Sequence, residues 1–127
     1  MTDVEIRGVV TPFNRLGRSL GYPTANVNAN QDLKDGVYFG YATLGRFKDN
    51  PAMIFIGTPT VPANCVRRVE AHLLGIPDQD YYDQEISISP RHFYRNNLKV
   101  NSPKELEQLL DADLRAALNW FNSGSKE

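Results

Sequence analysis

Residues 66–74, VRRVEAHLL, are the stretch that decides the fold of this chain. Apolar valine, alanine and leucine alternate there with polar side chains, among them Glu70 and His72. Successive side chains of a β-strand point to opposite faces, so this alternation predicts a strand with one buried face. The opposite face carries the side chains that could perform chemistry.

Other segments of the first hundred residues also have the composition of strands. They are rich in β-branched and aromatic residues and are bounded by turn-forming residues such as Gly36 and Pro59. The segments are residues 4–10, 37–44, 52–56 and 85–94. Pro90, inside the last of them, predicts an edge position or a bulge, because proline donates no ladder hydrogen bond.

The period of the apolar residues changes after residue 102. From Pro103 to Phe121 they recur three and four positions apart, which predicts an amphipathic helix. Ser102 is a suitable N-cap, Pro103 suits the first helical position, and Glu105 completes a capping box. Short strands followed by one terminal helix predict a closed or nearly closed antiparallel barrel with the helix packed against it.

The composition is that of one globular domain. The chain has 127 residues, of which 41% are hydrophobic and 23% charged. We expect a single domain over residues 1–127, with its core at about 6–121 and a flexible tail at 122–127.

Charge and hydropathy exclude several partners. With 14 basic and 15 acidic side chains, the net charge of −1 argues against duplex or single-stranded nucleic acid and against an anionic membrane surface. The apolar run at residues 52–56 is far shorter than the roughly 20 residues that span a bilayer. The N-terminus lacks the features of a signal peptide, and the single Cys65 allows no internal disulfide. We therefore expect a monomeric cytoplasmic protein.

A hydroxyl and a carboxamide stand two residues apart in PTAN, residues 23–26. If this backbone is extended, Thr24 and Asn26 share one face, and their oxygens are hard donors of the kind that suits Mg²⁺. The alternative is a polar turn that satisfies its own backbone.

The preceding residues 16–21, LGRSLG, combine two glycines with a cation. Gly17 would let backbone N–H groups approach a phosphate, and Arg18 would supply positive charge. Neither GxxxxGK[ST] nor GxGxxG occurs, so a solvated turn is the alternative.

Glu70 is the candidate general base. A carboxylate on a strand face could accept the proton of a hydroxyl that attacks a phosphoryl group. The alternative is a surface glutamate paired with Arg68 or with a neighbouring strand. His72 has no second histidine or cysteine at ligand spacing, so we propose no zinc site and expect it to hydrogen-bond within the barrel.

The order of these motifs along the chain is more specific than any one of them. Gly8 is followed by LGRSLGYPTANV (16–27), GVY (36–38), IGTPT (56–60) and RVEAHLL (68–74). Arg95 then precedes a helix that carries Asp113. This arrangement, over roughly residues 6–118, resembles the riboflavin kinase family, in particular the kinase module that bacteria usually fuse to an FAD synthetase domain.

The resemblance implies a fold and a reaction. The fold is a six-stranded antiparallel Greek-key β-barrel with a C-terminal α-helix. The reaction transfers the γ-phosphate of ATP to the 5′-hydroxyl of the ribityl chain of riboflavin, giving FMN and ADP with Mg²⁺ as cofactor. An earlier linkage to an FAD synthetase domain is compatible with this likeness.

The resemblance also implies roles for individual residues. Glu70 would be the catalytic base, while Thr24 and Asn26 would hold Mg²⁺ and the nucleotide phosphates. We expect the two oxygen donors and the carboxylate to face each other from opposite walls of the barrel. The remaining positions implied to contact ligands are Gly17, Arg18, Leu73 and Tyr82 for the nucleotide and Arg95 for the flavin.

One segment departs from the family pattern. Residues 11–15, TPFNR, contain no glycine where the family usually has one over the phosphates. Pro12 offers no N–H, and Phe13 disfavours positive φ. This departure favours an alternative function, an inert relative that binds flavin or nucleotide as a sensor or carrier.

Overall fold

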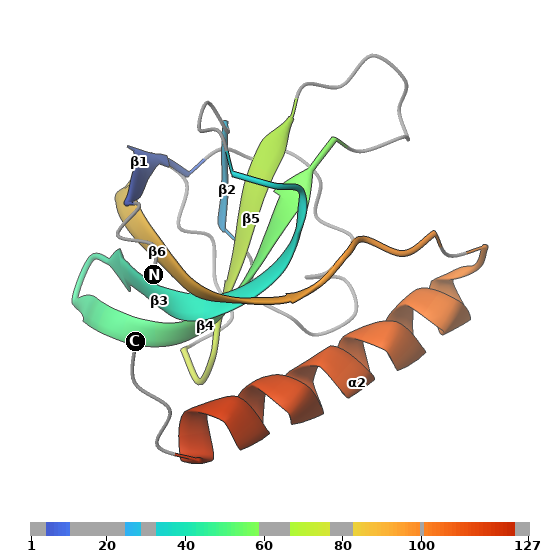
Figure 1. Cartoon of the computed structure of the whole chain (residues 1–127). Coiled ribbons are helices and arrows are strands. Elements are labelled where there is room, and N and C mark those ends of the chain that lie inside the picture. The colour runs from blue at the N-terminus through green and yellow to red at the C-terminus, as the bar shows by residue number, and fades with distance from the viewer. Residues whose placement is uncertain are drawn as a thin grey trace.

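The structure is a computed structural model that describes residues 5–10, 25–28, 33–58, 67–76, 83–99 and 101–123. Within these ranges the chain forms strands followed by one long helix (Figure 1). The strands are β1 (Ile6–Val9), β2 (Ala25–Asn28), β3 (Gly36–Leu44), β4 (Phe47–Gly57), β5 (Arg68–Leu73) and β6 (Glu85–Arg95), and the helix is α2 (Pro103–Asn122).

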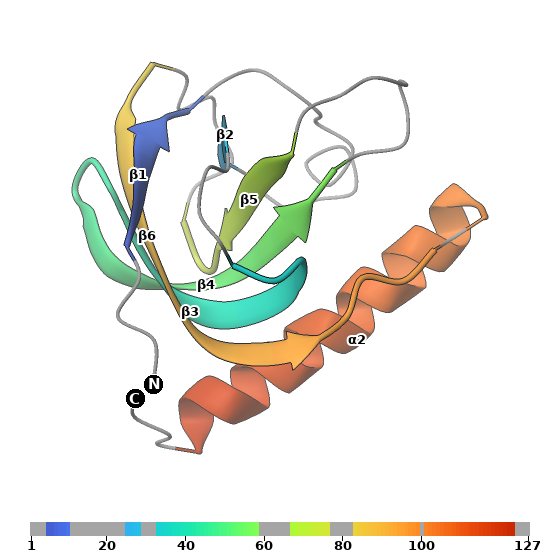
Figure 2. The same cartoon turned by 45° about the horizontal axis from the view of Figure 1, so that its top comes forward.

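The strands form a single antiparallel sheet in the order β1-β6-β3-β4-β5-β2. Strands β3, β4 and β5 follow one another as neighbours, and β2 lies beside β5, which is the Greek-key arrangement. The sheet is strongly curled, and α2 lies across its outer side (Figure 2). The predicted mainly-β architecture with a C-terminal helix is confirmed.

The two edge strands decide how far the sheet closes. Cα atoms of β1 and β2 approach one another within 8 Å, yet no ladder joins these strands among the described residues. The sheet is therefore a half-barrel with closely approaching edges, not a fully closed cylinder.

The inside of the curl holds the main hydrophobic core. Every strand with described side chains contributes to it, because one face of each carries apolar residues at alternate positions. Its largest members include Ile6, Tyr38, Leu44, Ile54, Ile56 and Ile88.

A second cluster joins the outer face of the sheet to α2. Phe39 of β3 packs against Tyr94 of β6 at a ring distance of 4.7 Å, and Trp120 and Phe121 of the helix close over it. Burying one such side chain contributes roughly 1.5–3 kcal/mol, so this cluster is what docks the amphipathic helix.

The helix begins where its sequence predicts. The backbone N–H of Glu105 donates to the Ser102 hydroxyl at 3.1 Å, and Pro103 occupies the first turn. The Glu105 carboxylate in turn accepts from the backbone N–H of Asn101 at 2.8 Å. The Ser102 N-cap and Pro103 in the first turn are confirmed. Glu105 binds the N–H of Asn101, one residue before the N-cap, and not that of Ser102 as a capping box would.

Pro90 lies at a bulge, as predicted. Gly40 is opposite Pro90 while Phe39 is opposite His92, so β6 has one extra residue at this point. A Cβ on Gly40 would lie 2.1 Å from the carbonyl oxygen of Ser89. The bulge therefore requires glycine on the neighbouring strand.

Strand β4 is longer than the apolar run at residues 52–56 predicts. It begins at Phe47, because a tight turn at Gly45 (φ 58°) pairs Leu44 directly with Phe47. Lys48 and Asp49, near its start, are polar and exposed, and an apolar pattern cannot reveal that part of a strand.

Candidate functional site

Strand β5 presents two chemically different faces. Val69, Ala71 and Leu73 are at most 2% exposed and belong to the core inside the half-barrel. Glu70 and His72 therefore lie on the outer face, which is also the face that α2 covers further along the sheet. The predicted alternation of a buried and a chemical face is confirmed.

Asn26 is directly opposite Glu70 in the β2–β5 ladder. Directly opposite residues of an antiparallel pair belong to the same face of the sheet, with Cβ atoms about 4.5–5.5 Å apart. A candidate metal ligand and the candidate base thus occupy adjacent positions. The expectation that they face each other from opposite walls of the barrel is wrong for this pair, because β2 and β5 are hydrogen-bonded neighbours.

Glu70 is partly screened from water. Its side chain is 23% exposed, and Phe55 is its partner on the other neighbouring strand, β4. Its Oε1 lies 3.5 Å from Nε2 of His72, which sits two residues along the same strand face. The Glu70 carboxylate thus lies beside the apolar Phe55 and one ring nitrogen of His72.

Leu73 belongs to the interior. Its side chain is 2% exposed and packs in the main core, so its described role is in packing. A contact between this position and a nucleotide stays a prediction.

Arg95, at the end of β6, is bound to the helix. Its Nε and Nη2 donate to the two carboxylate oxygens of Asp113 at 2.9 and 2.6 Å, and its Nη1 donates to the carbonyl of Asn96 at 2.8 Å. Asp113 is 1% exposed, which makes this bidentate pair the buried charge link between β6 and α2. A guanidinium has five N–H donors, so these bonds leave capacity for a flavin contact, which stays a prediction.

Several predicted positions lie outside the described residues. They are Gly17, Arg18, Thr24 and Tyr82, together with the TPFNR segment at 11–15. Among the ranges that are described, no group of three His, Cys, Asp or Glu side chains could hold a metal ion. The predicted Mg²⁺ ligands are of a different type, a hydroxyl and an amide oxygen.

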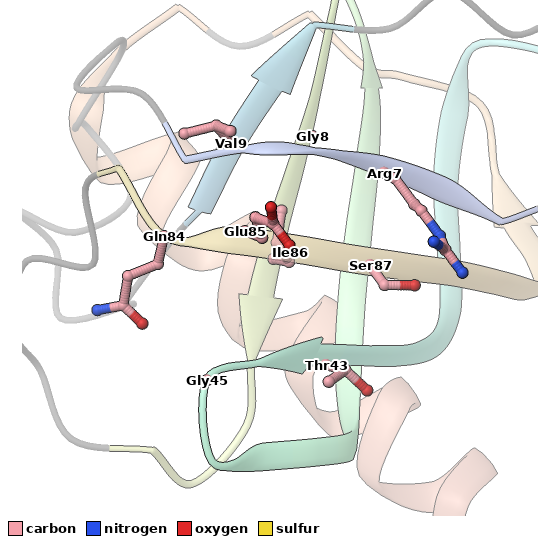
Figure 3. A pocket seen from close by; sticks show the side chains of 9 residues that line it. All are labelled: Arg7, Gly8, Val9, Thr43, Gly45, Gln84, Glu85, Ile86 and Ser87. Atoms are coloured by element: carbon pink, nitrogen blue, oxygen red, sulfur yellow. The ribbon is translucent and has the colours of Figure 1, made fainter.

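A groove lies elsewhere on the molecule, between β1, β6 and the β3–β4 turn (Figure 3). It is lined by Arg7, Gly8, Val9, Thr43, Gly45, Gln84, Glu85, Ile86 and Ser87. None of these is a predicted site residue.

Two lining residues of the groove, Arg7 and Ser87, contact the carboxylate of Glu5. Glu5 accepts from the Ser87 hydroxyl and pairs with Arg7 at 3.2 Å, and these contacts lower the pKa of the Glu5 carboxyl. We assign the groove no part in the chemistry of Glu70.

Of the two close side-chain pairs in this region, the sequence indicates only one. Glu70 and His72 stand two residues apart on one strand, a spacing that makes them neighbours. Arg95 and Asp113 lie on different elements, and only the docking of α2 brings them together.

Comparisons with known proteins agree on one family. Residues 1–121 match the family described as riboflavin kinase. The trifunctional protein RibF/MnmA of Mycoplasmoides gallisepticum is 31% identical over 99% of this chain and 19% of its own length. The bifunctional riboflavin kinase/FMN adenylyltransferase of Haemophilus influenzae is 32% identical, over 93% of this chain and 39% of its own. The riboflavin kinase of Homo sapiens is 25% identical, over 86% of this chain and 74% of its own length.

Solved structures agree on the fold. The crystal structure of riboflavin kinase from Trypanosoma brucei superposes with a TM-score of 0.68 at 22% identity, over 96% of this chain and 82% of that one. A crystal structure named as a macrolide-efflux protein from Streptococcus pneumoniae has a TM-score of 0.78 at 27% identity, over 94% of this chain and 40% of that one. The chain thus spans less than half the length of several proteins it resembles. Because the family match runs from β1 through the β2–β5 pair to α2, this chain belongs to the riboflavin kinase family.

Proposed function

We propose that this chain transfers the γ-phosphoryl group of ATP to the ribityl 5′-hydroxyl of riboflavin, giving FMN and ADP. Membership of the riboflavin kinase family supports the substrate class. The structural observation that carries the proposal is the register of the β2–β5 ladder, because it places Asn26 and Glu70 at directly opposite positions of neighbouring strands.

Glu70 is the general base of the proposed reaction. Its carboxylate takes the proton as the ribityl O–H bond breaks, the new O–P bond forms, and the bond to the β-phosphate oxygen breaks to release ADP. General-base assistance accelerates such a step roughly 10²- to 10⁴-fold. The apolar neighbour Phe55 reduces competition from water for the same carboxylate.

Asn26 and Thr24 are the proposed ligands of Mg²⁺ in its complex with ATP. Amide and hydroxyl oxygens are hard donors that fit this ion, and the register of Asn26 beside an anionic side chain fits a cationic site. When bound, Mg²⁺ neutralises charge on the transferring phosphoryl group.

The remaining residues are proposed to bind the two substrates. Gly17 and Arg18 would hold phosphates, Leu73 and Tyr82 would border the nucleotide, and Arg95 would meet the flavin. For Arg95 the support is its place on the helix side of β6 and a guanidinium held rigid by Asp113. A rigid cation loses little conformational freedom when it binds a ligand.

A second candidate is a relative that binds flavin or nucleotide without turnover. The absence of glycine from residues 11–15 favours it, because Pro12 supplies no backbone N–H to a phosphate. Retention of the oxygen donors and of Glu70 favours the enzyme instead.

Incubation with riboflavin, ATP and MgCl₂, followed by chromatography for FMN, separates the two candidates. We expect FMN from the wild-type chain and a loss of roughly 10²-fold or more in Glu70→Gln. Glu107→Gln, on an exposed position of α2, is the matched control and should keep full activity.

Flavin binding in the same samples completes the test. Glu70→Gln should still quench riboflavin fluorescence, since the base is not needed for binding. Quenching by the wild-type chain without FMN formation would establish the binder and reject the kinase.

We also propose a single domain over residues 1–127 and a monomer, on the basis of the one shared sheet and the ordinary composition. Helix α2 lacks the long apolar run of a membrane-spanning helix. A cytoplasmic location is proposed from the single cysteine and the family. Relatives named bifunctional riboflavin kinase/FMN adenylyltransferase support an adjoining FMN adenylyltransferase domain in some members of the family.

A further inference from the structure

His72 is a titratable side chain that the proposed mechanism leaves unused. It is 3% exposed, and its Nε2 lies 3.5 Å from Oε1 of Glu70. A buried imidazole is costly unless its nitrogens meet polar partners, so its place beside the carboxylate calls for a physical explanation.

We propose that His72 is a positioning residue for Glu70, holding one carboxylate oxygen so that the other is directed at the substrate hydroxyl. This inference rests on the proposed function of Glu70 as the base. It concerns the orientation of the carboxylate, and it assigns His72 no contact with substrate.

The surroundings of His72 hold its ring in place. Phe55 packs against the imidazole, with ring centroids 4.7 Å apart and an interplanar angle of 44°. Met53, its partner on β4, is completely buried. A ring clamped in this way has few alternative rotamers, so it can restrain a flexible neighbour.

Glu70 needs such a restraint. Its side chain has three rotatable bonds and is 23% exposed, so without a partner the carboxylate would sample several directions. The distance of 3.5 Å is slightly longer than an ordinary hydrogen bond of about 2.7–3.2 Å. Such contacts in ligand-free sites commonly tighten when substrate binds.

The chemistry of the pair is simple. In the proposed arrangement an N–H on Nε2 of His72 donates to Oε1 once the 3.5 Å contact shortens, while the carboxylate keeps lone pairs for a second donor. The ribityl proton goes to the carboxylate, and the imidazole neither gains nor loses a proton. Misplacement of a catalytic group by about 1 Å can cost roughly 10²-fold in rate.

Steady-state kinetics of FMN formation test the proposal in His72→Leu and His72→Gln. His72→Leu removes the donor and should lower kcat roughly 10- to 100-fold, while KM for riboflavin and ATP changes less than about twofold. His72→Gln retains an N–H donor and should recover most of the lost rate. In a Glu70→Gln background, His72→Leu should cause little further loss.

Each result has a distinct meaning. If the wild-type chain makes no FMN, the proposed function fails and this inference with it. If FMN forms and Glu70→Gln abolishes it, but His72→Leu keeps normal kcat, only the positioning role is overturned.

The positioning role is also overturned if His72→Leu and His72→Gln lower kcat equally. It is overturned too if His72→Leu lowers kcat as much in the Glu70→Gln background as in the wild-type chain. Circular dichroism verifies folding. If His72→Leu does not fold, His72→Asn replaces it and is compared with His72→Gln. The asparagine amide is too short to reach Glu70.

Discussion

Glu70 and Asn26 show what strand pairing adds to individual residues. Each has an ordinary alternative when considered alone, a surface glutamate and a polar turn. The β2–β5 register makes them neighbours on one face, and this proximity is what makes a shared reaction plausible. The residue types were predictable from the sequence, but their adjacency depended on which strands pair.

The first residue-scale prediction concerns Asn26. We expect Asn26→Ala to weaken binding of the Mg–nucleotide complex at least roughly 10-fold, while riboflavin binding changes little, because the substitution removes a proposed oxygen ligand of the metal. Isothermal titration calorimetry with each ligand measures this. Asn28→Ala, two residues along the same strand, is the control, and a larger effect on riboflavin than on nucleotide would contradict the metal assignment.

The second residue-scale prediction concerns Tyr38 and alkaline pH. Burial raises the pKa of Tyr38 above its ordinary 10.0, and its hydroxyl donates to the carbonyl of Lys34 at 2.6 Å. As the pH rises, Tyr38 therefore loses its proton in the unfolded chain before it does so in the folded chain. The stabilisation that the neutral Tyr38 hydroxyl gives the folded state is complete below about pH 10 and is lost as the pH rises through the higher folded-state pKa.

Urea unfolding at several pH values between about 8 and 11 checks this expectation, because this range brackets the ordinary tyrosine pKa of about 10. Tyr38→Phe should lose about 1 kcal/mol at pH 8 through the missing hydrogen bond, yet its stability should fall less steeply above pH 10. Tyr41→Phe serves as the comparison. Equal alkaline slopes in wild type and Tyr38→Phe would refute the assignment.

At the scale of elements, α2 depends on two different attachments. Aromatic packing around Phe39 fixes its C-terminal half, and the Arg95–Asp113 pair fixes a point nearer its middle. The helix itself was predictable, since its cap, its proline and its apolar period are all local signals. Which residues of the sheet it would meet was not, because docking depends on the curl of β3, β4 and β6.

Removing the charge of Asp113 tests the second attachment. Asp113→Asn leaves the Arg95 guanidinium without its anionic partner, and breaking such a buried pair costs about 3 kcal/mol. Urea unfolding followed by the fluorescence of Trp120, the single tryptophan, reports both stability and helix docking. Glu107→Gln, on an exposed position of the same helix, should change stability by less than about 0.5 kcal/mol. A small decrease in the free energy of unfolding of Asp113→Asn would show that the Arg95–Asp113 pair contributes little to stability.

At the scale of the whole molecule, the pairing of β3 with β6 joins the first strand of the β3–β4–β5 run to the last strand among the described residues. Strand β6 carries β1 on one side and β3 on the other, and its bulge at Pro90 bends it around the core. The close approach of Gly40 to Ser89 is the tightest requirement of this junction among the glycines with described surroundings.

Gly40→Ala is therefore expected to be strongly destabilising. A Cβ at 2.1 Å from a backbone oxygen forces β3 and β6 apart, and overpacking of this kind costs roughly 1–3 kcal/mol or more. A thermal melt by circular dichroism gives the measurement. Gly75→Ala, where a Cβ would meet nothing within 4 Å but φ is +82°, separates backbone strain from steric overlap. An unchanged melting temperature in Gly40→Ala would contradict the described junction.

The sequence by itself determined the strands with clear alternation, the capped helix and the residue types of the candidate site, and it limited Pro90 to an edge position or a bulge. These are local properties, set by side-chain period and backbone chemistry within a few residues. Only the tertiary structure decided that Asn26 pairs with Glu70, that Arg95 is held by Asp113, and that the sheet stops at a half-barrel. Those outcomes depend on contacts between distant segments, whose free energies no short stretch of sequence contains.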